Sequence, residues 1–100
     1  IVRQEAQEVN FMRAFVTVVG KDKVGIIAAI CILLAEKNVN ILDISQTILQ
    51  DCFTMIMLVD ASDSTVPFDA LGESLSELGR KMELTIRIQR EEIFNAMHRI

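Results

Sequence analysis

The sequence contains no tryptophan, no tyrosine, one proline and one histidine among its 100 residues. Surfaces that bind nucleic acid are usually basic and carry aromatic side chains that stack on bases. This chain has a net charge of −4, and its five aromatic residues are all phenylalanine. We therefore expect no nucleic-acid partner.

Catalytic signatures are also missing. Catalysis needs a reactive side chain with partners at a set spacing, and the only histidine, His98, lies close to the end of the sequence. The HExxH, CxxC, GxSxG and GxGxxG patterns do not occur. We expect no enzyme activity, no cofactor and no bound metal.

Membrane and secretion signals are weak. The longest fully apolar run, residues 26–35, is shorter than the roughly 20 residues that a membrane-spanning helix needs, and no signal-peptide pattern precedes it. Cys31 and Cys52 stand apart in apolar runs, as reduced core cysteines of cytoplasmic proteins do. We predict a cytoplasmic protein with no membrane partner.

Hydrophobic residues make up 51% of the chain, which is enough for one core in one domain. Residues 12–90 carry the periodic patterns and form the predicted domain. Residues 1–11 are polar; Met12 is a candidate initiator, which would make them an added extension, and the alternative is a short native helix or arm. Residues 91–100 are expected to form a short C-terminal helix.

The periodicity inside the domain predicts an alternation of strands and helices. Runs rich in β-branched residues, or alternating between apolar and polar, predict strands, and apolar residues at spacings of three and four predict helices. Leu42, Ile44 and Ile48 are expected on one face of a strand whose other face is wet. The expected strands are residues 13–19, 41–49, 52–59 and 84–89, and the expected helices are residues 24–36 and 67–82.

This order, βαββαβ, predicts an α+β fold. Two right-handed βαβ crossovers of this kind give a ferredoxin-like sandwich, in which a four-stranded antiparallel sheet carries both helices on one face. The other face of the sheet is then bare. The helix at residues 24–36 is apolar nearly all round, which predicts burial on more than one side.

The stretch from residue 16 to 27 is the leading candidate for a binding site. A strand ends at Gly20, a short charged turn follows, and a helix begins near Gly25, with Asp22 as the expected N-cap. The start of a helix exposes backbone N–H groups that suit a carboxylate. Ile26 and Ile27 stand where a phosphate-binding loop needs Lys and Ser or Thr, so a nucleotide is excluded.

The polar groups near this turn suit an α-amino acid. The Asp22 carboxylate accepts a hydrogen bond from an amine, the amides of Val24, Gly25 and Ile26 donate to a carboxylate, and Asn40 does both. In the alternative interpretation Asp22 is only a helix cap and Gly25 only a close-packing residue.

Two short segments resemble the signature of a known family. Asp22-Lys23-Val24-Gly25-Ile26, followed by Asn38-Val39-Asn40-Ile41, is similar to the D/N-x-x-G-(I/V/L) and VNI motifs of ACT domains. The longer stretches VTVVGKDKVGIIA, NVNILDISQTI and EEIFNAMHRI resemble the small stand-alone ACT proteins of bacteria. The resemblance covers residues 12 to 89.

The resemblance implies a regulatory module that binds an amino acid between two subunits. Matched by motif, the ligand-binding positions fall on Gly20, Asp22 and Asn40, with Gly20 in place of the histidine that amino-acid-binding members carry. The alternatives are an oligomerisation module or an enzyme accessory subunit that binds no ligand, and a larger protein partner fits each of these functions.

The family's side-by-side pairing through the first helix and second strand implies a homo-oligomer, either a dimer or a dimer of dimers. Such pairing covers the open edge of the second strand and excess apolar surface on the first helix. The interface residues implied are Ile26, Ile30, Leu33, Ile41, Leu42 and Ile44.

Overall fold

A computed structural model describes residues 12–92, and the structural statements below concern these residues. The elements are β1 (Arg13–Lys21), α2 (Ile26–Glu36), β2 (Asn40–Leu49), β3 (Cys52–Asp60), α3 (Phe68–Met82) and β4 (Leu84–Arg90). The predicted order is confirmed. The predicted C-terminal helix lies outside the described residues except for Glu91 and Glu92, which are helical, and residues 1–11 also lie outside.

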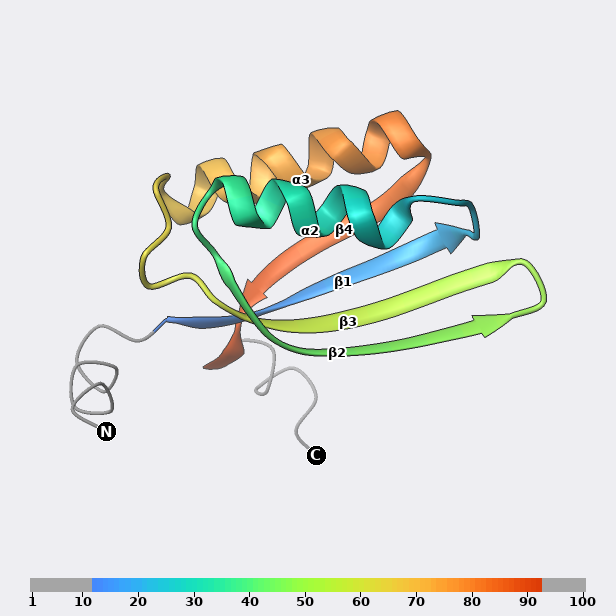
Figure 1. Cartoon of the computed structure of the whole chain (residues 1–100), viewed down its shortest axis with the longest axis horizontal. Coiled ribbons are helices and arrows are strands. Elements are labelled where there is room, and N and C mark those ends of the chain that lie inside the picture. The colour runs from blue at the N-terminus through green and yellow to red at the C-terminus, as the bar shows by residue number, and fades with distance from the viewer. Residues whose placement is uncertain (1–11, 93–100) are drawn as a thin grey trace.

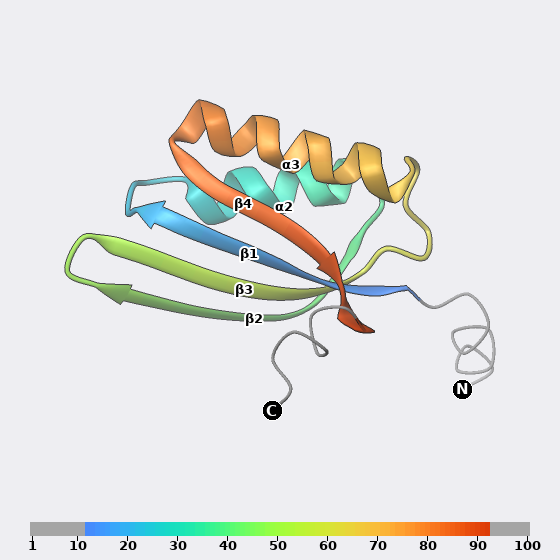
Figure 2. The ribbon, with the colours of Figure 1, turned by 180° about the vertical axis from the view of Figure 1, so that it is seen from behind.

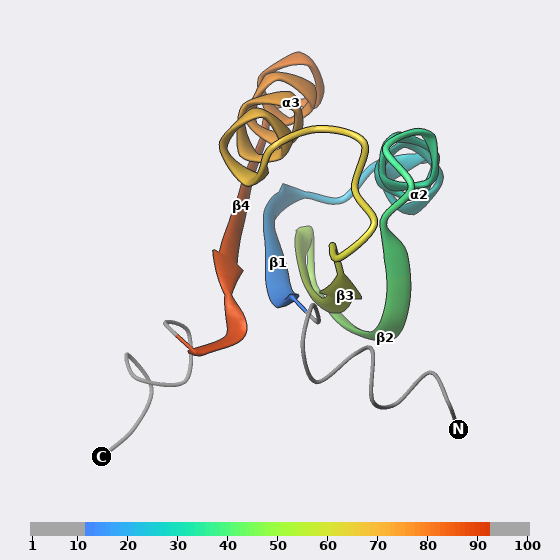
Figure 3. The ribbon, with the colours of Figure 1, turned by 90° about the vertical axis from the view of Figure 1, so that its left-hand side faces the viewer.

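The four strands form one antiparallel sheet in the order β2-β3-β1-β4. Both helices lie on the same face of this sheet, side by side, as Figures 1 and 2 show from opposite sides. The view along the strands in Figure 3 separates the two layers clearly. The predicted ferredoxin-like sandwich is confirmed.

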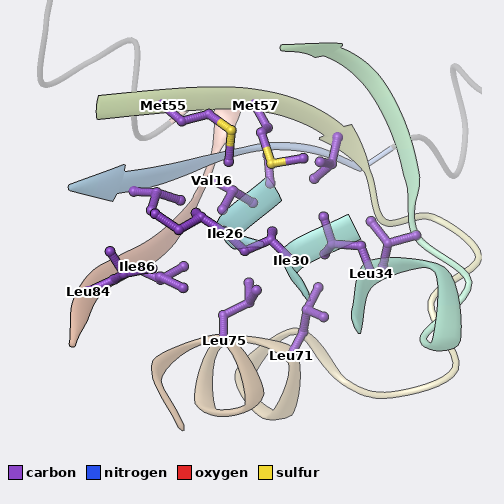
Figure 4. Close-up of a cluster of buried hydrophobic side chains, with 14 of the residues drawn as sticks. Val16, Ile26, Ile30, Leu34, Met55, Met57, Leu71, Leu75, Leu84 and Ile86 are labelled. Carbon is purple, nitrogen blue, oxygen red and sulfur yellow. The ribbon is translucent and has the colours of Figure 1, made fainter. Parts of the chain in front are cut away.

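The core fills the space between the sheet and the two helices. Alternate residues of β1 and β3 point to this inner face, as period-two patterning requires. Side chains from α2, α3, β3 and β4 converge there (Figure 4). The largest fully buried side chains are Ile30, Leu34, Met55, Met57, Leu71, Leu75, Val16, Val18 and Val59.

A glycine lets α3 approach β4 closely. A Cβ atom at Gly79 would lie 2.7 Å from the backbone oxygen of Leu84 and 3.2 Å from Cγ1 of Ile86. Every other residue type would push the end of the helix away from the strand. Gly79 is therefore a packing requirement of the contact between α3 and β4.

β2 departs from simple alternation. The register shifts between Ile41 and Asp43, which makes Leu42 the extra residue of a β-bulge. Because of this shift Ile41 lies opposite buried Val59, on the same inner face as Ile44 opposite Met57. The predicted alternation missed the bulge and therefore left Ile41 off the inner face.

The two cysteines differ in burial. Cys31 is half-buried on α2 and packs against the core, whereas Cys52 is exposed at the start of β3. The prediction of two core cysteines is wrong for Cys52, because its position directly after the β2–β3 turn puts it at the end of the sheet.

Candidate functional site

The turn between β1 and α2 is held by contacts to two neighbouring segments. The backbone N–H of Asp22 donates to the backbone oxygen of Asp51 in the β2–β3 turn at 2.8 Å. The ammonium of Lys23 lies 3.5 Å from Oε1 of Glu83, at the α3–β4 junction. Figure 1 shows this turn beside the tip of the β2–β3 hairpin. The turn is thus positioned by the fold and not only by its own sequence.

Helix α2 begins differently from the prediction. Its N-cap is Gly25, in the left-handed conformation with φ of 91°, and no side chain caps the helix. Asp22 is therefore not the N-cap, because the chain needs this left-handed glycine to turn into the helix three residues later. The first amides of α2 are left without a side-chain cap, and a Cβ atom built on Gly25 would meet nothing within 4 Å. Gly25 is required for its backbone conformation and not for close packing.

Gly20 has the opposite role. A Cβ atom there would collide with Cδ2 of Leu84 and would lie 3.2 Å from its Cα. Leu84 faces Gly20 across the β1–β4 pair and is buried. A leucine side chain from β4 fills the space that a side chain at position 20 would occupy, so Gly20 offers a ligand only its backbone.

Asn40 lies at the far end of the molecule from Asp22. Asn40 pairs with Asp60 at one end of β3, whereas Lys21, next to Asp22, pairs with Cys52 at the other end. Eight residues of strand separate these two ends, which is about 27 Å. Asp22 and Asn40 are both exposed, and within the described part of the chain their side chains make no hydrogen bond or ion pair. One protomer does not bring them together.

The remaining positions of the expected ligand site differ in burial. Val24 is fully exposed in the turn, and Gly25 is exposed beside it. Ile26 is only 2% exposed, so its side chain belongs to the core and only its amide is available to a ligand.

The expected interface residues fall into three groups. Ile26 and Ile30 are buried in the core of their own protomer, so they are wrong as partner-facing residues. Leu33 and Ile41 are half-buried, and Leu42 and Ile44 are exposed. On α2 and β2, the exposed large apolar side chains that the prediction missed are Ile32, Ile48 and Leu49.

The missed residues have a physical explanation. A helix that is apolar nearly all round gives no period from which its inner face can be read, so Ile32 and Ile30 look alike in the sequence. Ile32 is 58% exposed, while Ile30 is fully buried. For Ile48 a signal existed, since it alternates with Ile44 along β2.

Within residues 12–92 there is no cluster of three or more His, Cys, Asp or Glu side chains that would hold a metal ion. In the same part of the chain, neither helix has the length and apolar character needed to cross a membrane.

Comparison with known proteins identifies the family. The family model described as ACT domain matches residues 13–89. The chain belongs to the ACT-domain family. Among curated relatives, a UPF0237 protein of Clostridium acetobutylicum is 57% identical over 89 residues, which is 89% of this chain and all of that protein. A UPF0237 protein of Methanocaldococcus jannaschii is 49% identical over 88% of this chain and 98% of its own length.

Solved structures show the same fold. An ACT domain protein from Streptococcus pneumoniae is 44% identical, with a TM-score of 0.74 over 85% of this chain and 96% of that one. A putative glycine cleavage system transcriptional repressor is 25% identical, with a TM-score of 0.67 over 80% of this chain and 46% of the repressor. A formyltetrahydrofolate deformylase from Pseudomonas syringae shares the fold at 23% identity, with a TM-score of 0.72 over 89% of this chain and 31% of the deformylase.

Proposed function

We propose that this ACT domain is a non-enzymatic regulatory module that binds an amino acid, or a similar small metabolite, at the boundary between two protomers paired along β2. The observation that carries the proposal is the separation of Asp22 and Asn40 to opposite ends of the β2–β3 ladder. Two-fold pairing of exposed β2 edges joins these ends.

The β2 edge has the apolar surface that such pairing needs, and α2 exposes a further apolar side chain. Ile44 and Ile48 lie on the inner face opposite buried Met57 and Phe53, yet they are 39% and 51% exposed. Ile32 adds an exposed apolar side chain from α2. Apolar area that a partner removes from water contributes about 25 cal/mol per Å². An edge strand with this surface pairs readily with a second copy.

Antiparallel pairing of β2 with its copy assembles one polar site at each end of the interface. Leu49, the last residue of β2, lies opposite Cys52, which in turn lies opposite Lys21. The β2–β3 turn, which follows Leu49, is held to the β1–α2 turn by the hydrogen bond from the Asp22 N–H to the Asp51 oxygen. Since an antiparallel pair sets the start of one strand against the end of the other, Asn40 approaches Asp22 of the partner subunit.

The groups at this boundary have the chemistry of an amino-acid site. The Asp22 carboxylate accepts from a ligand ammonium, the uncapped amides at the start of α2 donate to a ligand carboxylate, and the Asn40 amide does both. At roughly 1 kcal/mol per heavy atom, such a ligand binds with a dissociation constant in the micromolar range or weaker. Binding at the boundary favours the paired arrangement, and this linkage passes the ligand state to a protein partner.

A first test screens the twenty amino acids by thermal shift and titration calorimetry. We expect at least one to raise the Tm of the intact protein, and we expect Asp22→Ala and Asn40→Ala each to abolish the shift. Glu73→Ala, which removes an exposed carboxylate on α3, is the matched control and should bind as the intact protein does. If no amino acid binds while the protein remains a dimer, the protein is an oligomerisation module or accessory subunit.

A further inference from the structure

The face of the sheet turned away from α2 and α3, called the outer face below, is partly apolar. Phe15 and Leu58 are cross-strand partners on β1 and β3, and Val19 and Ile56 continue the apolar surface along the same strands. Among the elements in residues 12–92, no helix covers this face, as the view along the strands shows (Figure 3). A four-stranded sheet with one apolar face open to water is unfavourable unless another segment covers it.

The burial of the outer face is uneven. Phe15 and Leu58, near the end of β4, are half-buried. Val19, further along β1 on the same face, is 45% exposed, and Leu49 at the far end of β2 is 72% exposed. The shielded part of the outer face is thus the part next to the position where the chain leaves β4.

The chain leaves β4 toward the outer face. Arg13 alternates with buried Ala14, so it lies on the same face as Phe15. Its guanidinium Nη2 lies 2.6 Å from Oε2 of Glu91, and both side chains are about one third exposed. Glu91 and Glu92 are already helical. This ion pair holds Glu91, directly after β4, against Arg13 on the outer face, away from α2 and α3.

We propose that residues 91–100 form an amphipathic helix that packs across the outer face of the same protomer, over Phe15 and Leu58. Ile93, Phe94, Met97 and Ile100 have the spacing of one helical stripe, and Asn95 and Arg99 fall on the opposite side. The helix is a third layer of the fold that leaves the β2 edge free for pairing.

The length of this segment selects the same protomer as its target. Ten helical residues extend about 15 Å, at 1.5 Å per residue. The distance from β4 to β2 is three strand spacings, about 14 Å. The helix therefore spans β1 and β3 and ends near β2, and it does not reach the sheet of a partner paired beyond that edge.

Residues 1–11 are the competing cover, since they also enter the sheet at this end, where the backbone N–H of Met12 donates to Oγ of Ser62 at 2.8 Å. Their sequence fits less well, because their apolar side chains, Ile1, Val2, Ala6, Val9 and Phe11, are interrupted by the polar and charged residues 3–5 and 7–8. The Glu91 ion pair and the apolar stripe favour the C-terminal segment.

The test compares point variants on the two sides of the proposed helix by thermal unfolding. Phe94→Ser should lower the Tm by roughly 5–10 °C, because it removes an apolar contact to the sheet. Asn95→Ser, on the opposite side, should leave the Tm unchanged. Combining Phe94→Ser with Phe15→Ala should lower the Tm by less than the sum of the single effects, whereas combining it with Val19→Ala should be additive.

Two further measurements separate the possible occupants. Deleting residues 93–100 should increase the fluorescence of the apolar dye ANS about twofold or more, while deleting residues 1–11 should leave it unchanged. The reverse result would assign the cover to the N-terminal segment and overturn the proposal. A Phe94→Ser effect that disappears when the protein is diluted to monomer would also overturn it, by placing the helix on a second copy. Equal Tm values for Phe94→Ser and Asn95→Ser would show that no such helix packs on the sheet.

Discussion

The two halves of this fold, β1–α2–β2 and β3–α3–β4, occupy equivalent places around the sheet but expose different surfaces. Helix α3 has a polar outer side, and the edge strand beside it carries charged Arg87 and Arg90. Helix α2 exposes Ile32, and its edge strand exposes Ile44 and Ile48. The half that contains α3 and β4 exposes mainly polar and charged side chains to water. The half that contains α2 and β2 exposes apolar side chains that a single protomer does not cover. We infer from this difference which edge pairs with a second copy.

In the proposed dimer, the charged β4 edge limits pairing to two protomers along the sheet. If both edges paired with their own kind, the sheets would join into an open fibre. Two copies of β4 paired antiparallel near their centres would set Arg87 against Arg87, and like charges directly opposite each other are unfavourable. Charges on an edge strand are a common defence against such pairing.

The largest expected difference lies between two residues of α2, one in the core and one exposed. Ile30→Ala removes a fully buried side chain and should lower the free energy of unfolding by about 2–5 kcal/mol. Ile32→Ala, two residues along the same helix, should change the unfolding of the protomer by less than about 0.5 kcal/mol and should instead weaken dimerisation. Chemical denaturation at low protein concentration checks the first effect, and sedimentation checks the second. Similar unfolding losses in both variants would refute the division of α2 into a core side and a partner side.

A second prediction sets the two edge strands against each other. Ile44→Lys with Ile48→Lys buries two unpaired ammonium groups at the proposed interface and should weaken dimerisation by roughly 100-fold or more. Thr85→Lys, at an exposed position of β4, should leave the dimer intact. Analytical ultracentrifugation at micromolar concentration gives the readout, with circular dichroism to confirm that both variants fold. If Thr85→Lys dissociated the dimer and the β2 double variant did not, the interface would lie at β4 and not at β2.

The smallest expected effect concerns the turn that begins α2. Gly25→Ala forces a side chain into the left-handed conformation, which should cost about 1–2 kcal/mol of stability by strain alone, because a Cβ atom there meets no neighbour. Gly25→Asn should cost less, since asparagine tolerates this conformation better. Thermal unfolding ranks the two variants. A larger loss for Gly25→Asn would mean that the space beside Gly25 is filled.

The fold was predictable from sequence because its determinants are local. Period-two runs, helical spacings and turn residues such as Asn38, which adopts a φ of 61°, each specify their own segment. The predictions failed where the local conformation depends on a neighbouring strand or turn. The bulge at Leu42 depends on the register with β3, and the helix start at Gly25 depends on where the β2–β3 turn holds Asp22.

The sequence points to residue types for a candidate site but not to their arrangement in space. Asp22 and Asn40 stand out in the sequence, yet only the strand register shows that they lie at opposite ends of one protomer. Likewise, the sequence alone shows only that Gly20 has no side chain to offer a ligand. The structure shows that Leu84 fills the space that a side chain there would occupy. Partner-facing and core-facing isoleucines of α2 are indistinguishable before the sheet is in place.

In the proposed dimer, each ligand site takes Asp22 from one protomer and Asn40 from the other. The direct measurement is complementation between Asp22→Ala and Asn40→Ala, each of which binds nothing alone, using the amino acid that gives the largest thermal shift with the intact protein. Unfolding and refolding the two variants together forms mixed dimers in which one site has both side chains intact. Calorimetry should then recover about one quarter of the binding sites, as random mixing across a two-fold interface requires. Recovery of no binding, with mixed dimers shown to be present, would contradict a shared site.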